Sequence, residues 1–261
     1  MSARERVADL WDEVVANWQP GQDVWPGPLD DWFKSYRGRG SGAVDLDQYP
    51  DPWVGDLRGR VREPRLVVLG LNPGIGYEEL QGPNGTWTKR ILDTGYSHCL
   101  HRSPPEDPAG WIPVHKRPSA YWVRVEHFAR RWLGDTSAGH RDILNFELYP
   151  WHSPKLTGGL ASPPAIVREF VLDPVAEVGV PQVFAFGAAW FKVAAGLALP
   201  ILASWETNRG DWPSEFTGWR VGVFGLPSGQ QLVVSSQPGT GAPPSQAKVD
   251  ALRVALQGLL G

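Results

Sequence analysis

The sequence predicts an α/β fold, a three-layer α/β/α sandwich around a central, mostly parallel sheet of four strands. The first observation is the run from Leu66 to Gly70, which carries no polar side chain and is typical of a strand covered on both faces. The second is that strand patterns alternate with helical patterns along residues 65–261, which favours parallel strands joined by helices. The third is a Gly/Pro-rich turn at residues 72–77, which begins where the first strand ends.

The first 64 residues have a different pattern from the rest of the chain. An amphipathic helix is expected over residues 4–18, with an apolar stripe made by Val7, Leu10, Trp11, Val14, Val15 and Trp18. Prolines and glycines interrupt residues 19–64, which predicts a long surface segment with a short helix near residues 30–36. We therefore divide the chain into an N-terminal extension, residues 1–64, and an α/β domain, residues 65–261.

The α/β domain is expected to contain core strands joined by amphipathic helices. The strands are expected at residues 66–71, 142–148, 182–186 and 231–235. The helices are expected at residues 86–93, 119–133, 163–178, 188–197 and 244–260, with Ser119 as the N-cap of the second. Residues 219–224 predict a further strand or half of a hairpin, and residues 98–118 predict an irregular segment.

Composition excludes several classes of protein. The chain has 261 residues, of which 42% are hydrophobic and 20% charged, as in globular proteins. The net charge of −3 argues against a protein that coats nucleic acid, although it allows a local basic groove. A single cysteine excludes an internal disulfide and any four-cysteine metal site. With no signal peptide and no apolar run near the roughly 18 residues of a membrane helix, a cytoplasmic protein without a membrane partner is expected.

Polar side chains follow or interrupt three of the expected strands. Asn72 follows the first strand, Asn145 lies in the second, and Gln237 follows the last. His152 and Ser153 come shortly after the second strand. Because the carboxyl ends of parallel strands line the ligand crevice of α/β sheets, these side chains are candidates for one site.

Three segments carry a resemblance to a known family: Leu69-Gly70-Leu71-Asn72-Pro73-Gly74, Ile143-Leu144-Asn145 and Ser236-Gln237-Pro238-Gly239. Together they resemble the uracil-DNA glycosylase superfamily, particularly its mismatch-specific and single-strand-selective branches. The order of the segments and their strand context agree with the family pattern from about Arg65 to the C-terminus. The first 60 residues have no such match.

The resemblance implies a divergent DNA glycosylase, which hydrolyses the N-glycosidic bond of a flipped deaminated or damaged base, uracil or a related one. In this reading Asn72 positions the water, Asn145 reads the base edge with its amide, and Gln237 steadies the leaving base. Trp87 or Tyr77 stacks on the base, while the backbone at Pro73 and Gly74 approaches a ligand oxygen. No metal or organic cofactor is required.

The expected partner is DNA, single- or double-stranded, bound by a monomer. Lys89 and Arg90 lie near Trp87 in sequence and are candidate phosphate contacts, and Ser236 and Gly239 are placed against the DNA backbone by the resemblance. His152 and Ser153 are candidates for contact with a phosphate or the base. Their alternative role is to belong to a loop stabilised by Trp151 and Pro154.

The chain departs from the family pattern at the last motif. The family's histidine is replaced by Gln237, a weaker electrostatic partner for the departing base, and residues 239–244 lack the apolar wedge that fills a flipped-out position. The alternative function is therefore a non-catalytic nucleic-acid or nucleobase-binding protein on the same fold. His98, Cys99, His101 and His115 have loose metal-ligand spacing without a second pair at a standard interval, so no metal site is predicted.

Overall fold

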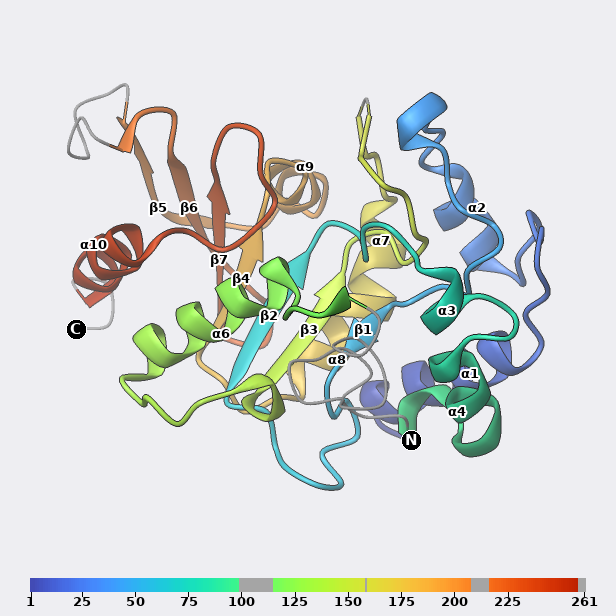
Figure 1. The fold of residues 1–261 in the computed structure, drawn as a ribbon. Helices are drawn as coiled ribbons and strands as arrows, with labels where there is room; N and C mark the ends of the chain where they lie inside the picture. Colours follow the sequence, from blue (N-terminus) through green and yellow to red (C-terminus); the bar gives the residue numbers. More distant parts are fainter. Residues whose placement is uncertain (99–114, 158, 208–215, 258–261) are drawn as a thin grey trace.

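The computed structural model describes residues 1–98, 115–157, 159–207 and 216–257. Its centre is a seven-stranded mixed sheet with the order β1-β3-β2-β4-β7-β6-β5 (Figure 1). The strands are β1 (Trp53–Val54), β2 (Leu66–Gly70), β3 (Ile143–Glu147), β4 (Gln182–Phe186), β5 (Ile201–Glu206), β6 (Arg220–Gly225) and β7 (Gln231–Ser236). The protein is thus an α/β protein, as the sequence predicts.

The four predicted core strands form the parallel part of this sheet. β2 pairs in parallel with β3 on one side and β4 on the other, and β4 pairs in parallel with β7. The sheet is nevertheless mixed rather than mostly parallel, because β1, β5 and β6 add antiparallel pairs at its two edges. The expected further strand at residues 219–224 is β6, which forms hairpins with both β5 and β7.

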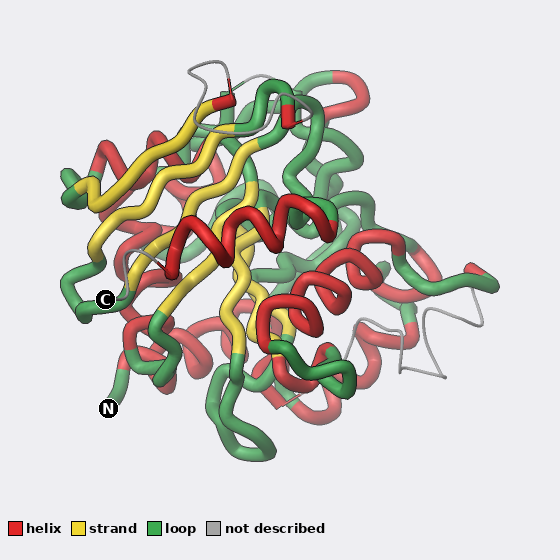
Figure 2. The backbone as a smooth tube through the Cα atoms, turned by 90° about the vertical axis from the view of Figure 1, so that its left-hand side faces the viewer, coloured by secondary structure: helices red, strands yellow, loops and turns green. Residues whose placement is uncertain are grey.

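Helices cover both faces of the sheet, which gives three layers (Figures 1 and 2). One face packs against α6 (Ala120–Leu133) and α10 (Gln246–Gln257). The other face packs against α1 (Ala3–Ala16), α2 (Pro28–Lys34), α7 (Pro164–Val167), α8 (Asp173–Ala176) and α9 (Ala189–Gly196). A π-helical turn at Arg168–Leu172 joins α7 to α8, so the predicted helix over residues 163–178 is confirmed. None of the described helices is long and apolar enough to cross a membrane.

The alternation of side chains along the strands assigns each residue to one of these faces. Leu66 and Val68 of β2 contact the α6 side, whereas Val67 and Leu69 contact the α1 side. Both sets are apolar because both faces are covered. This two-sided burial explains the uninterrupted apolar run that the sequence presents at this strand.

The N-terminal segment is packed into the protein rather than lying on its surface. Trp11, Trp25 and Trp32 are buried and surround Trp151, with ring centroids 6.3, 5.2 and 6.1 Å from its indole. The prediction that residues 19–64 form a surface segment is therefore wrong for the tryptophans of this segment, which are buried. Proline and glycine interrupt the helical pattern of this segment but do not prevent its aromatic side chains from entering the core.

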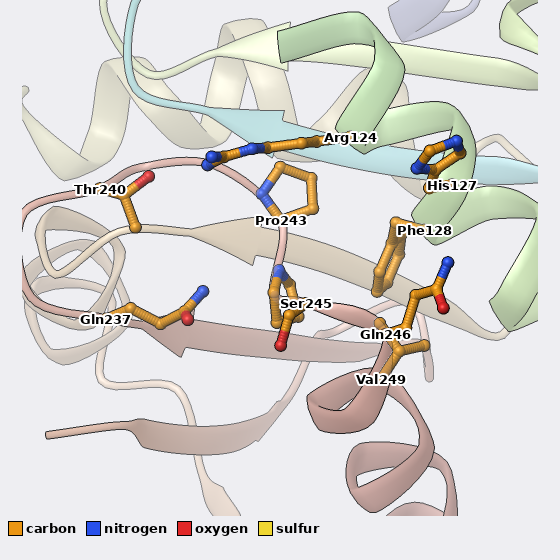
Figure 3. Close-up of a pocket in the computed structure, with 10 residues that line it drawn as sticks. Arg124, His127, Phe128, Gln237, Thr240, Pro243, Ser245, Gln246 and Val249 are labelled. Atoms are coloured by element: carbon orange, nitrogen blue, oxygen red, sulfur yellow. The ribbon is translucent and has the colours of Figure 1, made fainter. Parts of the chain in front are cut away.

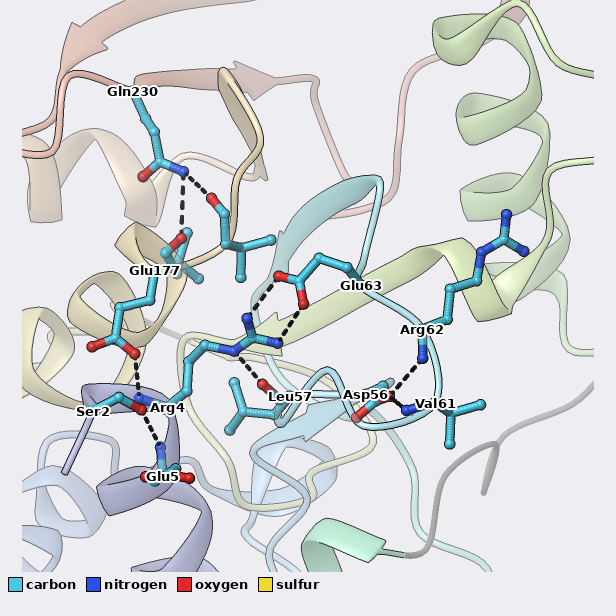
Figure 4. A network of polar contacts seen from close by, with 12 residues as sticks. Ser2, Arg4, Glu5, Asp56, Leu57, Val61, Arg62, Glu63, Glu177 and Gln230 are labelled. Carbon is cyan, nitrogen blue, oxygen red and sulfur yellow. Dashed lines mark hydrogen bonds and ion pairs between the residues drawn. The ribbon is translucent and has the colours of Figure 1, made fainter.

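Polar contacts fix the start of the chain to two distant segments (Figure 4). The Arg4 guanidinium forms an ion pair with Glu63 at 2.7 Å and also donates to the carbonyl of Leu57. The amides of Ala3 and Arg4 donate to the Glu177 carboxylate at 2.6 and 3.0 Å. This carboxylate lies at the N-terminus of α1, where it is favourably placed against the helix dipole.

Candidate functional site

A cavity of about 430 Å³ lies at the carboxyl ends of β2 and β3. The loop after β2 and the start of α6 (Ala120–Leu133) both contribute to its walls. The residues lining it are Asp51, Val54, Asn72, Pro73, Gly74, Ile75, Tyr77, Gln81, Trp87, Arg117, Pro118, Ser119, Ala120, Tyr121, Trp122 and Glu147. In the sheet, β3 lies on one side of β2 and β4 lies on the other. The cavity therefore lies beside the point where the strand order reverses, which is where ligands bind in open α/β sheets.

Asn72 is held in this cavity by the segment that follows β3. Its Nδ2 donates to the carbonyl oxygen of Ser153 at 3.1 Å and approaches the Ser153 hydroxyl at 3.4 Å. Among the described residues no donor bonds to its Oδ1, which leaves this oxygen as an acceptor for a ligand or water. Ser153 is fully buried and does not line the cavity, so its contact is with Asn72.

His152 fixes the shape of the loop after β2. Its ring lies 3.3 Å from the carbonyl of Gly74 through Nδ1 and 3.2 Å from Nε2 of Gln81 through its own Nε2. Burial lowers the pKa of His152, so the neutral ring donates from Nδ1 to Gly74 and accepts from Gln81. The Oε1 of Gln81 accepts from the amide of Tyr77, so Gln81 contacts the end of the loop directly and Gly74 through His152. His152 itself lies behind the cavity wall.

A carboxyl group, Glu147, lines the cavity where β3 ends. Its Oε1 accepts a hydrogen bond from Nδ2 of Asn145 at 2.7 Å, whereas its Oε2 is buried without a hydrogen bond from any described residue. Burial, together with the nearby charge of Asp51, raises the pKa of Glu147 to about 8. The neighbouring strand leaves room for this group because residue 70 is glycine: a Cβ there would lie 2.3 Å from Oε2.

Asn145 does not line the cavity but donates a hydrogen bond to Glu147. It is 1% exposed and does not line the cavity. The Tyr121 hydroxyl donates to its Oδ1 at 2.8 Å, and its Nδ2 is bonded to Glu147, so both ends of the amide are occupied. Burial raises the pKa of Tyr121 well above its ordinary value, which keeps its hydroxyl a donor. Residues 145 and 147 reach the α6 side together because side chains two apart share a face of a strand.

Aromatic side chains from two separate segments of the chain line the cavity. Tyr77 belongs to the loop after β2, and Trp87 belongs to α4 (Thr86–Thr94), which follows the short helix α3 (Glu78–Gln81). Tyr121 and Trp122 come from the first turn of α6. The ring of His115 lies edge-on to Tyr77 at 4.2 Å. Both of the stacking residues expected from the sequence therefore line the cavity.

Gln237 lies outside this cavity and lines a second one of about 430 Å³ between α6 and α10 (Figure 3). Arg124, Phe128 and Thr240 also line this second cavity. The Oε1 of Gln237 accepts from Nζ of Lys248 at 2.9 Å. The structure therefore separates Asn72 and Gln237, the two residues to which the sequence assigns catalysis.

The remaining candidate residues lie around the two cavities. Lys89 is exposed and Arg90 half-buried, both on α4, the helix that carries Trp87. Ser236 ends β7, and Gly239 is exposed in the turn beyond it. Of the loosely spaced metal-ligand candidates, Cys99 and His101 lie outside the described residues. Within the described part of the chain, no group of three His, Cys, Asp or Glu could hold a metal ion.

Among the cavity residues that the sequence interpretation misses, Glu147 and Tyr121 carry the polar groups at the end of β3. Glu147 carries a signal, because a single carboxylate in a buried strand that is apolar except for Asn145 needs a compensating interaction or a function. Tyr121 carries none, because a tyrosine in an amphipathic helix is ordinary. Its role depends on the contact between α6 and β3, which only the folded chain provides.

The chain was compared with known protein families, with curated proteins and with solved structures. None of the three comparisons finds a match.

Proposed function

We propose that this protein is a divergent DNA glycosylase of the uracil-DNA glycosylase type, acting as a monomer on a flipped deaminated or damaged base. The observation that carries the proposal is one cavity that combines the free Oδ1 of Asn72, aromatic rings from two segments of the chain and the buried carboxyl of Glu147. Its volume of about 430 Å³ is in the range of small-ligand sites. Enzymes that act on a flipped base hold it by stacking and by hydrogen bonds to its edge.

Asn72 supplies the positioning step of this reaction. Its Oδ1 accepts a hydrogen bond from the water that attacks the anomeric carbon, and Ser153 holds the amide in place. An amide does not accept a proton near neutral pH, so Asn72 acts by orienting the water. The base lies between Tyr77 or Trp87 on one side and the start of α6 on the other.

Basic side chains near the cavity favour a polynucleotide over a free base. Arg117 lines the cavity and is exposed, and Lys89 and Arg90 extend from the helix that carries Trp87. Phosphates on either side of a flipped nucleotide would meet these groups. Ser236 ends β7 and Gly239 lies in the turn beyond it, and the backbone of both would contact the DNA strand further from the flipped nucleotide.

A second candidate function is binding of a nucleobase or nucleic acid without catalysis. Two observations favour it. Gln237 lies in a separate cavity, and the amide of Asn145 is already occupied by Tyr121 and Glu147. Gln237 and Asn145, which the resemblance assigns to contacts with the base, would therefore not contact a base bound in the cavity.

The test is an excision assay with single- and double-stranded oligonucleotides that carry uracil, hypoxanthine or xanthine. We expect base release by the wild-type protein and a loss of about 100-fold or more in Asn72→Ala. Asn17→Ala is the matched control, because among the described residues its exposed side chain bonds to the carbonyl of Glu13 in α1, so its loss should leave the rate unchanged. Binding without release would favour the second candidate, and neither binding nor release would overturn both.

A further inference from the structure

The structure points to Glu147 as the acid of this site: we propose that its carboxyl group donates a proton to the base as the N-glycosidic bond breaks. This inference rests on the proposed glycosylase function and assigns a group to its leaving-group step. It replaces Gln237, which the sequence places in that role but which lines the other cavity.

The hydrogen bonds around Glu147 fix the position of its proton. The Tyr121 hydroxyl donates to Asn145, and the Asn145 amide donates to Oε1 of Glu147. Because Oε1 accepts, it is the carbonyl oxygen of the neutral acid, and the proton lies on Oε2. This is the buried oxygen without a hydrogen bond among the described residues, in a residue that lines the cavity. A buried hydroxyl without a partner is costly, so a ligand that accepts from Oε2 is favoured.

The charges around Glu147 keep it in the acid form. Asp51, in the segment before β1, adds a like charge, and the Tyr121 hydroxyl on α6 remains neutral. His152, behind the loop, is also held neutral by burial. Arg117 is the cation among the described residues that line the cavity, and it is exposed. With its pKa raised to about 8, Glu147 carries its proton at neutral pH.

The step balances with water as the only other reactant. The bond between the anomeric carbon and the base nitrogen breaks, and its electron pair goes to the base. The proton on Oε2 moves to a ring nitrogen or carbonyl oxygen of the base, which leaves neutral. The water held by Asn72 forms the new bond to carbon, and the proton that it loses returns to the Glu147 carboxylate through solvent. The preferred substrates are bases that present an acceptor beside the glycosidic bond and leave poorly as anions.

The experiment measures single-turnover release of uracil and of 5-fluorouracil from the same oligonucleotide between pH 6 and pH 10. For uracil, the wild-type rate should fall about tenfold per pH unit above pH 8. Glu147→Gln should lower that rate about 100-fold or more and remove the fall. Because 5-fluorouracil is a more acidic leaving group, the variant should lose much less on that substrate. Glu169→Gln, at an exposed glutamate, is the matched control and should behave as wild type.

The outcomes separate this inference from the proposed function. If the wild-type protein releases no base, the proposed function fails. If it releases base but Glu147→Gln keeps the wild-type rate and pH profile, only the role of Glu147 is overturned. Should the variant not fold, the wild-type pH profile and the ratio of the two substrates decide: a flat profile above pH 8 overturns the role of Glu147.

Discussion

Glu147 is a single carboxyl group in a strand that is otherwise buried and apolar except for Asn145. Transfer of a carboxylate into such a position is costly, and the raised pKa is the direct expression of that cost. Asn145 satisfies one oxygen but not the other. A carboxyl group that is retained in a cavity wall at such a cost is a candidate for function. The same cost makes the free energy of unfolding depend on pH, which can be measured.

Glu147 should make the free energy of unfolding depend on pH. Its pKa rises from the ordinary value of 4.5 to about 8 on folding, so between these two values the folded protein holds a proton that the unfolded chain releases. This group therefore lowers the free energy of unfolding as pH rises, by up to about 1.4 kcal/mol per pH unit, until the effect levels off above pH 8. Denaturant unfolding of wild type and Glu147→Gln at pH 5, 7 and 9 measures the difference.

In that comparison Glu147→Gln should gain stability relative to wild type as pH rises. The difference between the two proteins removes contributions from other groups, including buried His152, whose lowered pKa acts in the opposite direction at acid pH. Glu169→Gln should follow wild type throughout. Parallel pH profiles for wild type and Glu147→Gln would contradict the raised pKa.

At the scale of elements, the site depends on the loop after β2 and on the segment after β3 that holds it. Gln81 donates to His152 and accepts from the Tyr77 amide, so it links the two. Gln81→Leu leaves the buried His152 Nε2 and the Tyr77 amide without these partners. We expect a loss of about 1–3 kcal/mol in the free energy of unfolding. Base release should also slow as the loop loosens.

The control for this change is Gln19→Leu, because Gln19 is exposed and its side chain makes no hydrogen bond to the described residues. Denaturant unfolding and the excision assay on both variants are the measurements. Equal stability of the two variants would show that the contacts of Gln81 do not hold the loop.

The elements that can be predicted from the sequence are those whose burial produces a local pattern of apolar residues. The four parallel strands are short, largely apolar runs, and α6 has a clear apolar stripe, so both can be predicted from the sequence. β1 has two residues within a Pro/Gly-rich segment, and β5 is an edge strand with Ile201 and Leu202 exposed, so neither has a strand pattern. Asn72 is predicted because it follows a recognisable strand end, whereas Tyr77 and Trp87 are predicted from the family resemblance. The roles of Asn145, Gln237 and Glu147 depend on how strands and helices face one another.

At the scale of the whole molecule, the N-terminal segment and the strands share one hydrophobic core. Trp151 is buried at its centre against Trp11, Trp25, Trp32 and Phe33. It directly precedes His152 and Ser153, the residues that hold the loop after β2 and Asn72. The same short segment therefore connects the aromatic core of the first 60 residues with the cavity.

Trp151→Ala should lower the free energy of unfolding by about 3–5 kcal/mol, since it opens a large cavity in the core. Trp205→Ala, on the edge strand β5 where the indole is partly exposed, should cost clearly less. Denaturant unfolding followed by circular dichroism measures both. An equally small loss in the two variants would mean that the tryptophan cluster contributes little to the core.

The hydrogen bond between Asn72 and Ser153 has a consequence for the order in which the protein is made. It joins residues 81 positions apart, and the bond from Gln81 to His152 spans 71 positions. During synthesis the loop after β2 leaves the ribosome well before the segment that fixes it. The nascent chain therefore has no assembled site until residue 153 has emerged and the second core strand has paired with the first.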